Sequence, residues 1–106
     1  MKIKIVKNNI LPFGKYVAMA IYPVIFVRKK YWIRYSEKRR EIILNHEKIH
    51  FAQQKELTSI LFYIEYVYWW LIRGYKNIPF EKEAYANEND LEYLKHREKF
   101  AYKKYI

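Results

Sequence analysis

The segment SEKRREIILNHEKIHFAQQKEL, residues 36–57, carries the clearest periodic pattern in the 106-residue chain. Ser36 is a typical N-cap residue, because its side chain can accept a hydrogen bond from the first turn of a helix. One side of the helix is then marked, at spacings of three and four residues, by Ile43, Glu47, His50, Gln54 and Leu57. The pattern predicts one helix from Ser36 to about Leu57, with Gln53 and Gln54 at the edge of the core or on the surface.

Within this helix, residues 46–50 read His46-Glu47-Lys48-Ile49-His50, an HExxH motif. Histidines four residues apart lie on the same helix face, so both imidazoles can reach one metal ion. Glu47 lies beside them, where its carboxylate can take a proton from a metal-bound water. Because the chain has no cysteine, any further ligand has to be a histidine or a carboxylate.

A third ligand is needed, since a catalytic zinc site has three protein ligands and one open position. No third histidine follows close behind His50, and the remaining one lies in the basic run Lys95-His96-Arg97, which is typical of a solvated face. Glu81 lies on a separate predicted helix, from about Pro79 to Asn87, and is the better candidate. Glu83 competes with it, although a spacing of two residues points the two carboxylates in different directions.

The combination of HExxH with a later E-x-x-A, here Glu81-Lys82-Glu83-Ala84, resembles the gluzincin clan of zinc metallopeptidases. The stretches HEKIHFAQQ (residues 46–54) and PFEKEAYANE (residues 79–88) also resemble a group of short bacterial zinc peptidases. The resemblance covers roughly the second half of the chain. It implies that Glu81 binds zinc, that Ala84 packs against the active-site helix, and that Tyr85 supports a histidine ligand. Tyr85 stands where the family usually has Asp or Asn.

The activity implied by the resemblance is hydrolysis of a peptide bond in a peptide or protein substrate. Zn²⁺ bound to His46, His50 and Glu81 would polarise the carbonyl group and lower the pKa of its water toward about 7. Glu47, as the catalytic base, would accept the water proton and later give it to the leaving amine. Tyr85 and Tyr93 are candidates for stabilising the oxyanion.

The remaining segments predict an α+β fold in one domain, residues 1–106, as a minimal zincin-like unit. A small N-terminal antiparallel sheet is expected from strands at residues 2–7, 16–22 and 24–34. Pro23 favours an edge position for the strand Val24–Arg34, which could then align an extended substrate. An apolar helix ending at Gly74 backs the active-site helix, and a last helix runs from Asn89 to about Tyr105.

The net charge of +10 draws the chain toward anionic partners, although its basic residues are spread in pairs and triplets typical of a solvated surface. Aromatic residues reach 20%, and Tyr and Trp suit places with one apolar and one wet side, including bilayer interfaces. The apolar stretch Leu57–Ile72 is short for a membrane span and contains Glu65. An ordinary buried helix is the preferred interpretation, with contact to a membrane interface as the alternative.

An alternative function follows from the charge and the aromatic helix, which catalysis does not explain. In this hypothesis the chain is a non-catalytic zincin-like module that binds an anionic membrane surface or a protein partner. No nucleic-acid-binding motif is present, so specific binding to nucleic acid is not expected. Pro23 interrupts the N-terminal apolar stretch and no small-residue cleavage site follows it. We therefore expect a cytoplasmic location, with peripheral contact to the membrane left open.

Overall fold

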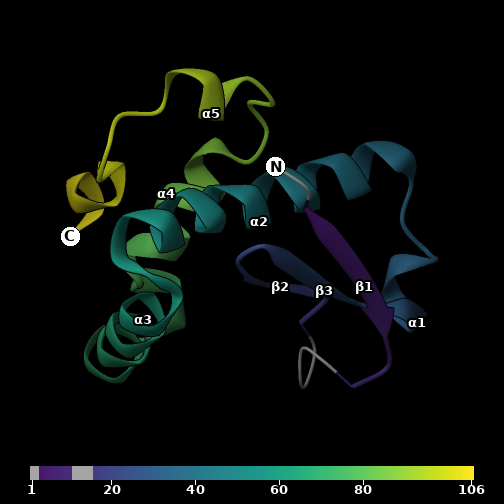
Figure 1. Ribbon diagram of the computed structural model, residues 1–106, viewed down its shortest axis with the longest axis horizontal. Helices are drawn as coiled ribbons and strands as arrows, with labels where there is room; N and C mark the ends of the chain where they lie inside the picture. Colours follow the sequence, from purple (N-terminus) through teal and green to yellow (C-terminus); the bar gives the residue numbers. More distant parts are fainter. Residues whose placement is uncertain (1–2, 11–15) are drawn as a thin grey trace.

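The computed structural model describes residues 3–10 and 16–106 and has an α+β architecture (Figure 1). Its order is β1 (Lys4–Asn8), β2 (Ala18–Ile21), β3 (Val24–Arg28), α1 (Lys29–Trp32), α2 (Glu37–Leu57), α3 (Ser59–Arg73), the 3₁₀ turn η1 (Tyr75–Asn77), α4 (Pro79–Asn87), α5 (Tyr93–His96) and the 3₁₀ turn η2 (Ala101–Tyr105). The α+β expectation is confirmed. Residue 2, the expected start of the first strand, lies outside the described residues.

The three strands form a mixed sheet in the order β1-β3-β2, with β1 parallel and β2 antiparallel to β3. The expected antiparallel sheet is therefore wrong, because the alternation of side chains along β1 sets its faces but not the direction of its pairing. The expected edge position of the strand Val24–Arg34 is also wrong. Pro23 lies in the turn before β3, where it removes no ladder hydrogen bond, and the strand ends at Arg28, where α1 begins.

Helix α2 lies across the sheet and supplies the framework for the rest of the molecule (Figure 1). Its N-terminus is capped as expected, since the Ser36 hydroxyl accepts a hydrogen bond from the backbone N–H of Arg39. A buried cluster joins the sheet to α1 and α2 and consists of Ala20, Ile25, Val27, Trp32 and Phe51. Gln54 is fully buried rather than at the surface, because its amide donates to the carbonyl of Ala20 and accepts from the N–H of Tyr22.

Helix α3 packs beside α2 and α4 through one side only. The core formed there consists of Phe62, Ile78, Phe80 and Tyr102. Phe62 is the only fully buried residue of α3, so the preferred interpretation of an ordinary buried helix is wrong. Gly74 ends α3 with a positive φ of 80°, as expected of a C-terminal glycine, although its ψ of 163° is extended rather than left-handed helical. Across residues 3–10 and 16–106, no helix is both long and apolar enough to cross a membrane.

The predicted helix from Asn89 to Tyr105 is replaced by the single turn α5, an extended stretch and η2. Asp90 accepts a hydrogen bond from the N–H of Glu92, which makes a local turn instead of a capping box. Arg97 then leaves the helical conformation, and its guanidinium pairs with Glu56 and Glu83 in the interior. These buried ion pairs override the helical propensity of the segment.

Candidate metal centre

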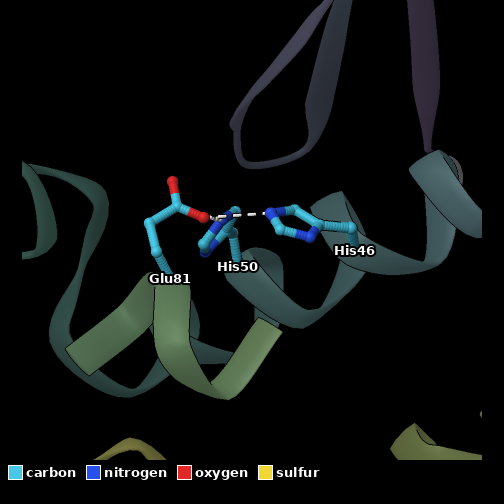
Figure 2. Close-up of side chains that lie close together, drawn as sticks. All are labelled: His46, His50 and Glu81. Carbon is cyan, nitrogen blue, oxygen red and sulfur yellow. Dashed lines mark hydrogen bonds and ion pairs between the residues drawn. The ribbon is translucent and has the colours of Figure 1, made fainter. Parts of the chain in front are cut away.

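The structure brings together His46, His50 and Glu81, which the sequence predicted as ligands (Figure 2). The two histidines project from consecutive turns of α2, and Glu81 comes from the first turn of α4. One carboxylate oxygen, Glu81 Oε1, lies 3.0 Å from His46 Nε2 and 3.1 Å from His50 Nε2. The three side chains are almost completely buried, between 5% and 7% exposed.

The spacing of these three atoms suits a tetrahedral metal ion. Zinc binds histidine nitrogen and carboxylate oxygen at about 2.0–2.2 Å, so neighbouring ligand atoms of a tetrahedron lie about 3.4 Å apart. The two distances to Glu81 Oε1 are close to that value, and all three ligand atoms lie within 4.8 Å of one another. The group could therefore hold a metal ion after small side-chain adjustments.

The other ring nitrogen of each histidine faces a hydrogen-bond acceptor. His46 Nδ1 donates to Glu88 Oε1 at 2.7 Å, and His50 Nδ1 donates to Gln53 Oε1 at 2.7 Å. The orientation of the Gln53 amide follows from its surroundings, because its nitrogen donates to the carbonyl of Phe80 and to Glu83 Oε1. With a proton on each Nδ1 held by these acceptors, deprotonation of the rings frees Nε2, the nitrogen that faces the site and that a metal ion requires.

A chain of buried polar groups behind His50 fixes this arrangement. The Glu83 carboxylate accepts hydrogen bonds from the Gln53 amide, from the Tyr93 hydroxyl and from the guanidinium of Arg97. Arg97 also makes two hydrogen bonds to Glu56 near the end of α2. Glu83, the competing ligand in the sequence, therefore faces Arg97 and not the histidines. Tyr93 pairs with Glu83, so it is not available to the oxyanion.

Glu81 is held so that one oxygen is presented to the histidines. Its second oxygen, Oε2, accepts a hydrogen bond of 2.6 Å from the hydroxyl of Tyr66 on α3. Tyr85, which the resemblance implied as support for a histidine ligand, contacts His46 through its ring and not through its hydroxyl. Its ring contacts the His46 ring edge-on at 4.6 Å, and its hydroxyl pairs with Tyr75, while Glu88 occupies the position beside His46 Nδ1. Ala84 is fully buried.

Burial and charge shift the pKa values of the cluster in opposite directions. Burial works to lower the pKa of His46, but hydrogen bonds with Glu81 and Glu88 outweigh it and raise the value to about 10. The pKa of His50 is also raised, because attraction to Glu81 exceeds the effect of burial. The two histidines in turn lower the pKa of Glu81 well below its ordinary value, although burial acts against them. Burial raises the pKa of Glu47.

A cavity of about 520 Å³ opens over the three ligands and is lined by Glu47 as well. The strand β2 lines it through Ala18–Ala20, and α3 lines it through side chains that are mostly aromatic. Most other lining side chains are apolar or aromatic, including Ile43, Phe62, Tyr63, Val67 and Trp70. The cavity therefore joins the three candidate ligands, the carboxylate of Glu47 and a largely apolar lining.

Comparisons of the chain with protein-family models, curated sequences and solved structures found no match. The resemblance to gluzincins consequently rests on the two short motifs. Three supporting residues, Gln53, Glu88 and Arg97, were not predicted from the sequence. Gln53 and Glu88 lie inside the two motif stretches, and this position was the only sequence signal for their roles. Arg97 gave no such signal, because it lies in a run of basic residues.

Replacing Glu88 by Ala is expected to weaken zinc binding by about 10–100-fold, the usual effect of losing the hydrogen-bond partner of a metal-bound histidine. Without Glu88 the His46 ring loses the acceptor that fixes its tautomer and orientation. Zinc affinity can be measured by competition with a chromogenic chelator. Glu92→Ala is the matched control, because Glu92 is exposed and pairs only with Lys95 among the described residues. Equal affinities in the two variants would contradict the role given to Glu88.

Raising the pH is expected to destabilise the metal-free protein, kept so by a chelator. It should also increase the stabilisation that added zinc provides. With a pKa of about 10 in the fold against an ordinary 6.5, His46 stabilises the fold fully below about pH 6.5. That contribution is lost as the pH rises toward about 10. Zinc bound to the His46 ring would displace the same proton, so we expect its affinity to rise over this pH range.

Thermal unfolding between about pH 6.5 and 9, in chelator and in excess zinc, measures this difference. The gap between the two melting temperatures should widen with pH, and His46→Ala should show almost no gap. If the difference between the two melting temperatures of the unsubstituted protein narrows as the pH rises, the assignment of His46 as a ligand would be contradicted.

Proposed function

We propose that the chain is a zinc-dependent metallopeptidase with His46, His50 and Glu81 as the zinc ligands. The observation that carries the proposal is the convergence of both Nε2 atoms on Glu81 Oε1 while both Nδ1 atoms face acceptors. Two histidines and one glutamate form one of the ligand sets of catalytic zinc, which keeps a fourth position for water or substrate. The absence of sulfur ligands agrees with a hydrolytic rather than a purely structural site.

Zinc bound there would supply Lewis acidity, which polarises a carbonyl group and makes a bound water acidic. Glu47 adjoins His46 in the sequence and lines the same cavity. Its carboxylate would accept the proton of the attacking water and deliver it to the leaving amine. Burial raises the pKa of Glu47, which makes its carboxylate a stronger base, although the two neighbouring histidines act against this shift.

The cavity suits an extended polypeptide as substrate. The strand β2 lies at the edge of the described sheet, and Ala18–Ala20 line the cavity. An extended peptide can add to such an edge through main-chain hydrogen bonds, here on the N-terminal side of Ala20, because the Ala20 carbonyl already accepts from Gln54 and Tyr63. This role belongs to β2 and not to Val24–Arg34, because β3 is paired on both sides. Tyr85 also lines the cavity and remains the candidate for stabilising the oxyanion.

A second candidate function is a non-catalytic module that binds a membrane surface or a protein partner. The specific observation in its favour is the outward side of α3, where large apolar side chains such as Ile60 and Leu71 are 75% and 81% exposed. Hydrolysis does not require that surface. The module would keep the metal for stability alone, with Glu47 as a bystander.

Incubation of the zinc-loaded protein with a mixed peptide library at neutral pH, read by mass spectrometry, separates the two functions. A peptidase should cleave a consistent set of bonds, lose the activity in a chelator and recover it with added zinc. Cleavage that persists in the chelator would exclude the zinc mechanism. No cleavage of any library peptide by fully zinc-loaded protein would favour the non-catalytic module.

A further inference from the structure

Helix α3 carries a continuous apolar surface that the core does not use. Its members are between 47% and 81% exposed, and we refer to them as the apolar face of α3: Ile60, Leu61, Ile64, Val67, Tyr68, Trp70, Leu71 and Ile72. At about 100° per residue they occupy an arc of about 200° around the helix. No charged side chain falls within that arc. A patch of this kind on a small protein marks a docking surface.

The centre of the face is aliphatic. The most exposed side chains, Ile60, Ile64 and Leu71, lie along its midline. The amphipathic ring of Trp70 forms one margin and is 47% exposed, whereas Leu61 and Ile72 form the other margin, beyond Tyr68. A helix in the plane of a bilayer interface places such aliphatic side chains deepest, with Trp and Tyr rings able to lie at the level of the headgroups.

The face also reaches the mouth of the metal cavity. Val67 and Trp70 belong both to the apolar face and to the lining of the cavity. On the side of β2, a shallow groove between Ile21, Ile60 and Ile64 extends the apolar surface toward the sheet. A surface that docks on α3 would therefore lie next to the entrance of the cavity.

Charge indicates which kind of surface would dock. The chain has 21 basic and 11 acidic residues, a net charge of +10, and Lys55 and Lys76 lie exposed close to the two ends of α3. Arg73 stacks on the ring of Trp69, on the side of α3 away from the apolar face. Two copies of such a chain repel each other, which disfavours a homodimer through this face. The partner has to be anionic and has to accept apolar side chains over a broad arc. An anionic bilayer has both properties.

We propose that the apolar face of α3 docks on the surface of an anionic bilayer, with α3 lying in the interface. The cavity then opens at the membrane surface, so the substrate would be a polypeptide segment held at that surface; this second part rests on the proposed peptidase function. Docking itself depends on α3 and the basic residues and does not depend on catalysis.

Flotation of the zinc-loaded protein with vesicles tests the docking. Vesicles of phosphatidylcholine with about one-third phosphatidylglycerol should bind the native sequence, and binding should weaken as salt rises because exposed charges are screened. Leu71→Glu should reduce the partition coefficient by about tenfold or more, since an apolar side chain in the interface is replaced by a charge. Ile33→Glu is the matched control. Ile33 is 63% exposed away from α3, and both variants change the net charge equally.

The outcomes distinguish the occupants of the face. Equal loss in Leu71→Glu and Ile33→Glu, or no binding to anionic vesicles, overturns the proposal. Concentration-dependent dimerisation without lipid, abolished by Leu71→Glu, would assign the face to a second copy and also overturns it. Quenching of tryptophan fluorescence by brominated lipid, lost in Trp70→Phe, supports docking through this face.

Zinc content separates docking from the proposed function. Leu71→Glu should keep the zinc content of the native sequence, so lost flotation cannot be attributed to a damaged metal site. If the native protein floats but cleaves no peptide, docking stands and the proposed peptidase activity fails. If it cleaves peptides but does not float, the reverse holds.

Discussion

Glu47→Gln is expected to reduce the rate of peptide hydrolysis by about 10²–10⁴-fold, the usual contribution of general acid–base catalysis. The substitution keeps the size of the side chain and removes its ability to accept a proton. Glu47 lines the cavity but is not one of the three residues that converge as ligands. The zinc content should therefore stay at one ion per chain, and the rate loss should appear in kcat rather than in metal loading.

The rate is measured on a peptide selected from the library, with the protein fully loaded with zinc. Glu41→Gln is the matched control, because Glu41 lies exposed on the same helix and outside the cavity lining. That variant should retain the native rate. Unchanged cleavage in Glu47→Gln would show that the activity belongs to a contaminant or to a different base, and the mechanism would be wrong.

Glu81→Ala is expected to weaken zinc binding by more than the 10–100-fold that follows the loss of a hydrogen-bond partner of a ligand. The change removes the oxygen on which both Nε2 atoms converge and leaves two protein ligands. It also leaves the Tyr66 hydroxyl without its acceptor. Metal analysis after desalting should find close to one zinc per chain in the native protein and almost none in the variant.

Two controls keep this result interpretable. Glu98→Ala removes an exposed carboxylate that pairs with Lys104, and it should leave the zinc content unchanged. Circular dichroism of Glu81→Ala should retain the helical signal, because the cores on either side of α2 do not include Glu81. Full zinc retention in a folded Glu81→Ala protein would remove Glu81 from the ligand set.

The sequence predicted the candidate ligands because their arrangement is mostly local. Once α2 is helical, the spacing of His46 and His50 places both rings on one face, and the boundaries of α2 follow from the Ser36 cap and the apolar periodicity. The prediction of Glu81 as a ligand required the resemblance to a family motif, because the distance of Glu81 from the histidines depends on how α4 packs against α2. The predictions that depended on spacing within one helix were therefore the most informative.

The remaining features depend on contacts between distant segments. Gln53 and Glu88 support the two histidines, but the contact of Glu88 with His46 spans 42 residues. The sequence places Arg97 in a run of basic residues typical of a solvated face. In the fold its side chain is buried between the carboxylates of Glu56 and Glu83, and no sequence pattern predicts these ion pairs. The parallel pairing of β1 was missed, and the outward face of α3 was anticipated only by the alternative of contact with a membrane interface, since periodicity identifies faces but not what they pack against.

Diffraction from crystals of the zinc-loaded protein, recorded on both sides of the zinc absorption edge, tests the central claim most directly. We predict one anomalous peak per chain, about 2.0–2.2 Å from His46 Nε2, His50 Nε2 and one oxygen of Glu81. Glu47 should line the same cavity without binding the ion. No peak between these three side chains in zinc-saturated crystals, or a peak only at an exposed pair such as His96 and Asp90, would contradict it.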